Sequence, residues 1–423
     1  MKRLLCVYAD FDWLSAPTLV GELSYEHLRG SEVFGFKFDS EWLKNYPSLT
    51  LSDDLQPYAG WQYREMGSDI FGCFSDALPD RWGRTLLLRR EQVMATEEGR
   101  PVHRLTSFDF LIGIDDFSRM GGFRFKERLT TDFINQTKAL RIPPIASLKE
   151  LLVASKEVEK GEEKHLTPER KWLDQLLMPG TSLGGARPKA GVVDETGALF
   201  VAKFPSRKDE YDVGLWEHFA HFLASKAGIK VAYTKVVSLG EQYHTMLSRR
   251  FDRTNDGRRI HFASAMTLLG LTDGDNAQTG YGYLDIVDFI IKGCTDIEAN
   301  LRELYRRVAF NISIGNSDDH FRNHGFLLTP KGWTLSPAYD MNPTLNPYQS
   351  LLISSRTSEA DLSELLSVYE EYMLSHEVAT MIIDEVLAVV KNWEAYARPF
   401  QLSQREMTMF GRSFEQRLAK YSI

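Results

Sequence analysis

The sequence contains few cysteines and no long apolar run. Its three cysteines, Cys6, Cys73 and Cys294, lie far apart and form no CxxC pair, which excludes a zinc ribbon and a disulfide framework. No apolar run approaches the roughly 20 residues that a bilayer-spanning helix needs. The chain also starts with charged residues too early for a secretory signal. These absences predict a cytoplasmic protein with no membrane association.

The chain also lacks an excess of basic residues. With 50 Lys+Arg and 58 Asp+Glu its formal charge is −8, which argues against unaided binding to DNA or RNA. An apolar content of 43% is typical of globular proteins and excludes a disordered or fibrous chain. At roughly 100–200 residues per domain, this length predicts two or three domains.

Periodicity and composition divide the chain into three predicted segments. Residues 33–38 alternate as a half-buried strand does, and Asp80 after Pro79 marks the entry to an amphipathic helix. A charged stretch near residues 156–171 reads as a linker or a solvated helix, so we place a boundary just before it. Helical patterns dominate from residue 261 onward. We therefore predict domains at residues 1–149, 150–250 and 251–423.

Two acidic residues and one amide in the C-terminal half carry the strongest chemical signal. Asp318 and Asn323 have the D-x-x-x-x-N spacing of a kinase catalytic loop, in which the Asp accepts the hydroxyl proton and the Asn oxygen binds magnesium. Mg²⁺ prefers oxygen ligands, usually carboxylates together with substrate phosphates and water. We expect a hairpin with strands at residues 326–328 and 333–335 to place Asp340 as the second protein ligand.

Simpler readings of the same residues remain open. The sequence Asn-Ser-Asp-Asp at residues 316–319 is also ordinary turn and helix-cap chemistry. His320 beside two carboxylates could indicate zinc, but no second His or Cys ligand stands at a suitable spacing.

A glycine-rich segment upstream supplies a candidate phosphate loop. Residues 180–189 contain Gly184 and Gly185 but no Walker A motif. Small residues let backbone N–H groups approach phosphate oxygens, although the segment taken alone favours a plain turn. Two strands follow, at residues 190–193 and 199–204, joined by a turn at residues 194–197. Lys203 on the second strand stands where a kinase keeps the lysine that binds the α- and β-phosphates, and its apolar neighbours disfavour an unpaired surface ammonium.

The glycine loop, the strand lysine, the D-x-x-x-x-N segment and the later aspartate occur in the order found in kinases. Each signal is weak by itself, but this order is unlikely to arise by chance over some 160 residues. The residues therefore predict a phosphotransferase.

The whole pattern resembles the HipA family of bacterial Ser/Thr protein kinase toxins. The resemblance covers nearly the full chain, and the similar segments are Val20-Gly21-Glu22-Leu23, Leu78-Pro79-Asp80-Arg81-Trp82-Gly83-Arg84, Ser182-Leu183-Gly184-Gly185-Ala186-Arg187-Pro188-Lys189, Arg250-Phe251-Asp252-Arg253, Asn316-Ser317-Asp318-Asp319-His320-Phe321-Arg322-Asn323 and Pro337-Ala338-Tyr339-Asp340. It implies an α+β, two-lobed protein-kinase-like fold. An extra N-terminal β-rich domain and a mostly helical C-lobe belong to that fold.

The resemblance also implies the roles of individual residues. Asp318 becomes the catalytic base, with His320 in the same motif, and Asn323 and Asp340 bind Mg²⁺, while Lys203 clamps the phosphates of ATP. The other residues that the resemblance places at the nucleotide are Ser182, Gly184, Gly185, Ala186, Lys189, Arg249 and Phe251. Ser182 also occupies the position that family members autophosphorylate, and the added charge would repel nucleotide phosphates.

The implied function is a toxin kinase with a protein substrate and a small helix-turn-helix antitoxin that makes most of the DNA contact. This chain departs from the family pattern at Arg187, at Arg249 and at residues 261–264, which affects substrate choice more than the catalytic set. Two alternatives stay open: a small-molecule kinase on a related fold, and a non-catalytic corepressor that binds the antitoxin.

Overall fold

The computed structural model describes residues 2–66, 69–136, 142–163, 170–177, 185 and 187–421. They form two compact units, unit 1 with Met1–Lys208 and Leu247–Ala263 and unit 2 with Asp209–Met246 and Ser264–Ile423. These units do not follow the three predicted segments, and the three-domain division stays a prediction. None of the helices in the described part of the chain combines the length and the apolar character that a bilayer crossing requires.

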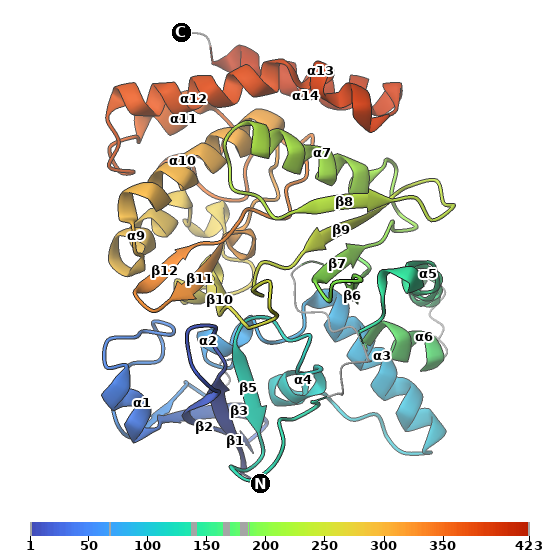
Figure 1. Ribbon diagram of the computed structural model, residues 1–423, viewed down its shortest axis with the longest axis vertical. Coiled ribbons are helices and arrows are strands. Elements are labelled where there is room, and N and C mark those ends of the chain that lie inside the picture. Colours follow the sequence, from blue (N-terminus) through green and yellow to red (C-terminus); the bar gives the residue numbers. More distant parts are fainter. Residues whose placement is uncertain are drawn as a thin grey trace. The chain divides into compact units, whose positions relative to one another are not determined.

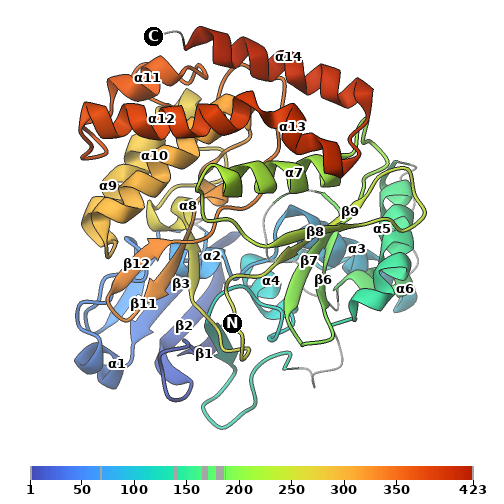
Figure 2. The ribbon, with the colours of Figure 1, turned by 45° about the horizontal axis from the view of Figure 1, so that its top comes forward.

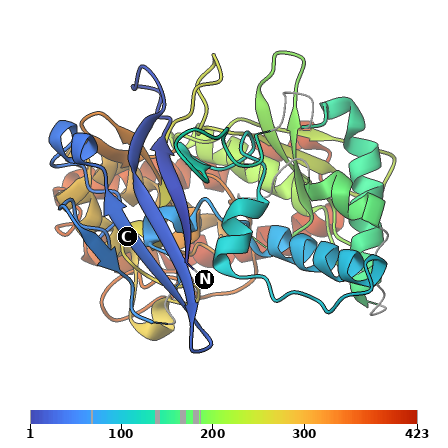
Figure 3. The same ribbon diagram turned by 90° about the horizontal axis from the view of Figure 1, so that it is seen from below.

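Unit 1 is built on a five-stranded antiparallel sheet of order β4-β3-β2-β1-β5, seen from below in Figure 3. Its strands are β1 (Arg3–Ala9), β2 (Thr18–Leu28), β3 (Ser31–Phe38), β4 (Trp61–Tyr63) and β5 (Phe123–Lys126). In β3 the aromatic residues alternate, and Phe36 packs on Phe74 with ring centroids 5.6 Å apart. This alternation confirms the strand predicted at residues 33–38.

Several helices of unit 1 begin at a capping side chain. The helices of this unit are α1 (Ser40–Asn45), α2 (Gly72–Ser75), α3 (Arg81–Glu97), α4 (Ser107–Gly113), η1 (Ile145–Ser147), α5 (Leu148–Glu163) and α6 (Arg170–Leu177). Helix α3 starts as expected, because the Asp80 side chain accepts a hydrogen bond from the Gly83 N–H at 2.8 Å. Helix α6 packs on both α3 and α5 (Figure 3), and α5 shows that much of the charged stretch is helix.

The predicted glycine-turn hairpin is present as β6 (Lys189–Val193) and β7 (Leu199–Lys203). Gly197 takes the left-handed conformation (φ 84°) that the turn between them requires. The two strands belong to a four-stranded sheet of order β6-β7-β9-β8, with β8 at Thr234–Val237 and β9 at Thr245–Arg249. The division between the two units falls inside β9.

Unit 2 is mostly helical, as expected for the C-terminal part. Its helices are α7 (Val213–Lys226), α8 (Ala265–Leu268), η2 (Ala277–Thr279), α9 (Tyr283–Gly293), α10 (Ile297–Ile314), η3 (Phe321–Asn323), α11 (Leu362–Ser367), α12 (His376–Lys391), α13 (Trp393–Ala397), η4 (Arg398–Phe400) and α14 (Gln404–Lys420). Helix α10 contacts both α12 and α14 (Figures 1 and 2). Trp216 of α7 packs on Phe410 of α14 with ring centroids 4.4 Å apart.

A short sheet positions the candidate site residues of unit 2. It has the order β10-β11-β12, with β10 at Phe262–Ser264, β11 at Gly325–Thr329 and β12 at Gly332–Leu335. Strands β11 and β12 form the hairpin predicted from residues 326–328 and 333–335. Both polar segments lie at the open end of this hairpin, with residues 315–324 before β11 and residues 336–342 after β12, because the start of β11 pairs with the end of β12.

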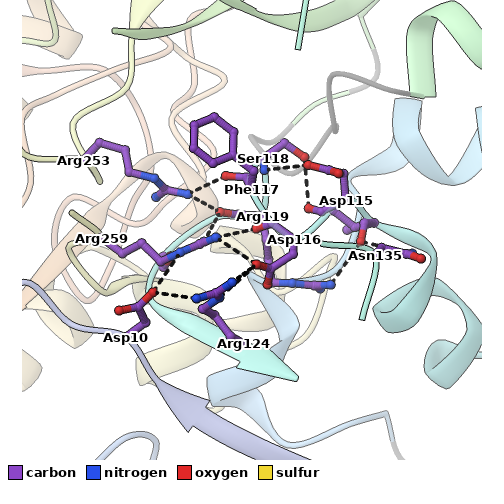
Figure 4. Close-up of polar contacts among 12 residues, drawn as sticks. Asp10, Asp115, Asp116, Phe117, Ser118, Arg119, Arg124, Asn135, Arg253 and Arg259 are labelled. Atoms are coloured by element: carbon purple, nitrogen blue, oxygen red, sulfur yellow. Dashed lines mark hydrogen bonds and ion pairs between the residues drawn. The ribbon is translucent and has the colours of Figure 1, made fainter. Parts of the chain in front are cut away.

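Unit 1 buries a cluster of arginine–aspartate pairs (Figure 4). The carboxylate of Asp116, 2% exposed, accepts a hydrogen bond from Arg124 Nη2 at 2.6 Å, and Asp10 accepts one from Arg124 Nη1 at 3.2 Å. Arg259 Nη2 donates to the Asp116 carbonyl at 2.6 Å, and Arg253 Nη2 donates to the Phe117 carbonyl at 3.0 Å. Residues 115–119 are thereby tied to the segment that follows β9.

Asp252 is the most deeply buried carboxylate of this cluster, with no exposed surface. It accepts hydrogen bonds from Arg250 Nε at 2.8 Å, from Arg253 Nη1 at 2.6 Å and from the Gly121 N–H at 2.9 Å. Burial alone would raise the pKa of Asp252, but the two arginines hold it well below its usual range. Asp252 therefore stays ionised and fixes the R-F-D-R segment on the residues around Gly121.

We expect Asp252→Asn to destabilise unit 1 by about 3–5 kcal/mol at pH 7, because it leaves two buried arginines without their carboxylate. The lowered pKa means that the contribution of Asp252 is present above the unfolded-state value of about 3.9 and is lost as the pH falls through the folded-state value. Urea unfolding of wild type and variant should therefore differ most at neutral pH, and the difference should begin to shrink only as the pH falls below about 4.

The matched control is Asp256→Asn in the same segment, where the side chain is 63% exposed. Its effect should stay within about 0.5 kcal/mol. Equal effects of the two substitutions would show that the buried pair does not stabilise the unit.

Candidate active site

Asp318 lies in the loop between α10 and η3 and is exposed, whereas its neighbours Ser317 and Asp319 are 4% and 3% exposed. The loop begins where α10 ends at Gly315, in the left-handed conformation (φ 70°). A Cβ at this position would lie 2.9 Å from the Thr344 carbonyl oxygen, so both the conformation and the space require glycine. Asp318 is thus exposed to solvent, while the residues on either side of it are buried.

Asn323 and His320 close the loop around the Asp318 backbone. The Asn323 Nδ2 donates to the Asp318 carbonyl at 3.0 Å, and the His320 N–H donates to the same oxygen at 3.1 Å. Asn323 is 7% exposed, and its own N–H donates to the His320 carbonyl at 2.8 Å. The structure therefore brings Asp318, His320 and Asn323 together. Because Asn323 Nδ2 is used in the bond to Asp318, the amide oxygen Oδ1 is the atom of this side chain that would bind a cation.

Asp340 follows β12 in the left-handed region (φ 56°), a conformation that is uncommon for residues other than glycine and that concentrates at functional sites. Its Oδ1 lies 3.4 Å from Asn342 Nδ2, the donor of a long hydrogen bond. The Asn342 N–H in turn donates to Asn316 Oδ1 at 3.2 Å. Asn316 stands two residues before Asp318, so a short chain of amides connects the two acidic positions.

A buried polar network supports this loop from the helices behind it. Asp319 Oδ2 accepts hydrogen bonds from Tyr283 Oη at 2.7 Å on α9, from Asn311 Nδ2 at 2.7 Å on α10 and from His324 Nε2 at 3.0 Å before β11. Asn311 Oδ1 accepts from Asn316 Nδ2 at 3.1 Å, which joins this network to the amide chain. One carboxylate oxygen therefore ties three elements to the loop.

The charge of Asp319 is retained despite its burial. Burial raises the pKa of this carboxyl, but His324 and the hydrogen bonds from Tyr283 and Asn311 outweigh it and keep the pKa below its ordinary value. Burial and the adjacent Asp319 charge raise the pKa of Tyr283 well above its ordinary value, so its hydroxyl remains a donor. The Asp319 carboxylate is thus ionised, and the hydrogen-bond donors around it stabilise its charge.

The oxygen atoms of this site fit a magnesium ion that is shared with phosphates. Mg²⁺ in nucleotide sites takes one or two protein carboxylates together with phosphate oxygens and water. Asn323 Oδ1 and the Asp340 carboxylate match that donor set, and Asn342 Oδ1 is a further buried oxygen for which the described chain offers no hydrogen-bond partner. Among the described residues no three His, Cys, Asp or Glu side chains gather as a metal cluster.

The residues predicted to hold the nucleotide lie in unit 1. Lys189 and Lys203 are paired across the β6–β7 hairpin. Lys189 is 3% exposed and its Nζ forms an ion pair with Asp80 Oδ2 at 2.9 Å, while Trp82 Nε1 donates to its carbonyl at 3.0 Å. A Cβ on Gly185 (φ 94°) would lie 3.1 Å from Lys189 Nζ, so the ammonium also lies beside the glycine segment.

The other predicted nucleotide residues are only partly described. Arg249 ends β9, and its Nη2 donates to Asn255 Oδ1 at 2.9 Å. Phe251 packs on Phe262 with ring centroids 5.8 Å apart. Ser182, Gly184 and Ala186 lie outside the described residues.

Sequence reasoning missed the residues that hold the site in place. Asp80 was interpreted only as a helix cap, and the side chains of Tyr283, Asn311, Asp319 and Asn342 received no role. A usable signal was Asn311, a polar residue inside the apolar run of α10 and 3% exposed. A buried amide in such a run needs polar partners, which indicates a network.

Two family models match the chain. The model of the HipA-like C-terminal domain matches residues 181–393, and the model of the HipA N-terminal domain matches residues 13–108. The first alone spans half of the sequence and includes the loop around Asp318. The chain belongs to the HipA family.

Curated relatives in the family match parts of the chain. A putative kinase of Haemophilus influenzae is 27% identical over 222 residues, which cover 46% of this chain and 63% of the relative. The serine/threonine-protein kinase toxin HipA of Shewanella oneidensis is 28% identical over 136 residues, which cover 28% of this chain and 31% of the toxin. The matches therefore span less than two thirds of either relative.

A solved HipA structure has the same fold. The structure of Shewanella oneidensis HipA with HipB and operator DNA aligns with a TM-score of 0.69 at 18% identity, covering 98% of this chain and 96% of the HipA chain. This match confirms the predicted α+β, kinase-like HipA fold with its N-terminal β-rich part.

We expect Asp319→Asn to destabilise the protein by about 1–3 kcal/mol, because three donors lose a charged acceptor in a buried site. Hydrogen exchange of the amides at residues 316–324 should also quicken. The control is the same substitution one residue earlier, Asp318→Asn, which removes an exposed charge and should cost less than about 0.5 kcal/mol. If the two variants unfold at the same urea concentration, Asp319 does not anchor the loop.

Proposed function

We propose that this HipA-family chain is an ATP- and Mg²⁺-dependent serine/threonine protein kinase that acts as the toxin of a toxin–antitoxin pair. The observation that carries the proposal is the geometry of unit 2. Asp318 is exposed on a buried loop, Asn323 is fixed on its backbone, and a chain of amides links the same loop to Asp340. The names of the two curated relatives, both kinases, support the same activity.

In this proposal each polar group of the loop has a defined task. Asp318 accepts the proton of the substrate hydroxyl while that oxygen bonds to the γ-phosphorus of ATP and the bond to the leaving ADP oxygen breaks. Asn323 Oδ1 and the Asp340 carboxylate hold Mg²⁺, which neutralises charge on the phosphates when it is bound. His320 keeps the loop closed through its backbone bonds to Asp318 and Asn323.

The nucleotide contacts come from unit 1. Lys203 would bind the α- and β-phosphates, and Lys189, fixed by its ion pair with Asp80, would support the glycine segment. The remaining proposed contacts are phosphate binding by the backbone of Gly184, Gly185 and Ala186 and adenine binding near Arg249 and Phe251. Ser182 is the proposed autophosphorylation site that turns the kinase off.

The proposed partner is a HipB-like helix-turn-helix antitoxin that makes most of the DNA contact. The solved relative is a HipA complex with HipB and operator DNA, which supports this assignment. The formal charge of −8 agrees with it, because an acidic chain gains little from direct contact with DNA phosphates.

Two other functions are distinguished by one assay. A small-molecule kinase on this fold would transfer the labelled phosphate of ATP to a metabolite rather than to a protein. A non-catalytic corepressor would transfer none, and the presence of Asp318, Asn323, Asp340 and Lys203 together argues against it.

We expect Asp318→Asn to keep ATP binding and to lower the rate of phosphoryl transfer by roughly 10²–10⁴-fold, the usual contribution of a positioned general base. Transfer from labelled ATP to lysate proteins and binding of a fluorescent ATP analogue measure the two properties separately. The control is Asp288→Asn, an exposed carboxylate on α9, which should behave as wild type. Near-normal transfer by the Asp318 variant would remove this residue from the base role.

We expect Ser182→Ala to abolish self-inactivation while leaving the initial transfer rate unchanged. The wild-type kinase preincubated with ATP should lose activity with time and carry one phosphate in mass spectra. Phosphate on a different residue, or equal loss of activity in the variant, would show that the switch is elsewhere.

A further inference from the structure

Residues 345–348, which we call the docking loop, form an exposed segment of unit 2 shortly after Asp340. Leu345 is 58% exposed and Tyr348 is 54% exposed, with Asn346 and Pro347 between them, also exposed. Exposed apolar side chains are common singly, but here they stand on one short loop in the same unit as the exposed Asp318.

The docking loop is held by its own backbone hydrogen bonds. The buried Arg417 of α14 donates through Nη2 to the Asn346 carbonyl, and the Ala360 N–H donates to the Pro347 carbonyl at 3.0 Å. The Tyr348 N–H donates to Asn346 Oδ1 at 3.1 Å. These bonds satisfy the loop backbone within the unit, so the side chain of Leu345 and the ring of Tyr348 are the apolar groups that the loop offers to a partner.

Both ends of the docking loop are bonded to the segment that carries the proposed base. Before the loop, the Thr344 N–H donates to the Gly315 carbonyl at 2.8 Å. After the loop, the N–H and Oγ of Ser350 donate to the Ser317 carbonyl at 2.9 and 2.8 Å. Ser317 directly precedes Asp318, so the loop and the base belong to one hydrogen-bonded substructure.

The carboxylate opposite Tyr348 is already paired. Glu359, which lies opposite Tyr348 in a short antiparallel bridge, forms an ion pair with Lys420 at 2.5 Å. Paired charges beside apolar side chains favour an uncharged, apolar contact over a phosphate or another anion.

We propose that the docking loop binds the polypeptide that carries the accepting hydroxyl, through a large apolar side chain close to its Ser or Thr. The inference rests on the proposed kinase function and names the substrate class of that site. A hydroxyl that reaches Asp318 from a polypeptide brings its neighbouring residues onto the surrounding surface. The docking loop offers exposed apolar side chains, and the hydrogen bonds at both of its ends connect it to the segment that carries Asp318.

The test uses the full-length protein and a soluble peptide library with a central Ser or Thr. One flanking position at a time is fixed and all others are degenerate, and transfer from labelled ATP is measured. We expect the wild type to prefer Leu, Ile, Met or Phe at one fixed position by on the order of fivefold to tenfold, the effect of partial burial of such a side chain. In the double variant Leu345→Ser/Tyr348→Ser this preference should disappear.

Two comparisons separate the docking role from a general loss of structure. In the double variant the KM for the preferred peptide should rise while the KM for ATP stays at the wild-type value, and Tyr348→Phe should retain the preference. The matched control, Ile291→Ser/Met381→Ser, removes two other exposed apolar side chains of unit 2, 40% and 46% exposed, and should leave the preference intact.

The outcomes are distinguishable from failure of the proposed function. A wild type that neither binds nor turns over ATP contradicts the kinase proposal itself. A wild type that uses ATP but labels no peptide contradicts the docking proposal, as does a preference that survives in the double variant. Labelling of the low-molecular-mass fraction of a lysate in place of peptides would assign the site to a small-molecule substrate.

Discussion

The proposed catalytic loop depends on the burial of one ionised carboxylate, Asp319. A carboxylate 3% exposed is costly unless donors replace the water that it has lost. Here the donors come from Tyr283, Asn311 and His324, which belong to separate elements of unit 2. The carboxylate can therefore be satisfied only when α9, α10 and the loop before β11 are all in place. Its neighbour Asp318 is exposed because the chain turns back to meet these donors.

Unit 1 also buries ionised carboxylates, but there their partners are arginines. Asp252 and Asp116 are buried among arginines, so their main partners are charged donors, with the Gly121 N–H as a neutral donor to Asp252. Pairs of this kind add little net stability relative to apolar packing but are expensive to break. They therefore fix the relative placement of residues 115–124 and the R-F-D-R segment, and a neutral substitute at either position would not.

Local features were predictable from the sequence because they depend on near neighbours. The hairpins around Gly197 and at residues 325–335, the cap at Asp80 and the D-x-x-x-x-N spacing are all set within a few residues. The partners that hold them are set by the fold. The ion pair between Lys189 and Asp80 joins positions 109 residues apart, and Tyr283 reaches Asp319 across 36 residues. No local spacing encodes these contacts, so the sequence could name candidate site residues but not the distant residues that hold them.

The close approach of the residues before the docking loop explains why α10 ends at a glycine, Gly315. The left-handed glycine both stops the helix and leaves room for the Thr344 carbonyl, because a Cβ there would lie 2.9 Å from that oxygen and 2.8 Å from Arg417 Nε. Any larger residue would push apart the segment that carries Asp318, the backbone at Thr344 just before the docking loop and the buried Arg417 that holds the loop. The connection between the Asp318 segment and the docking loop therefore depends on the absence of a Cβ atom at residue 315. In the proposed docking role, a surface tied in this way moves together with Asp318, which would keep the accepting hydroxyl aligned with the proposed base.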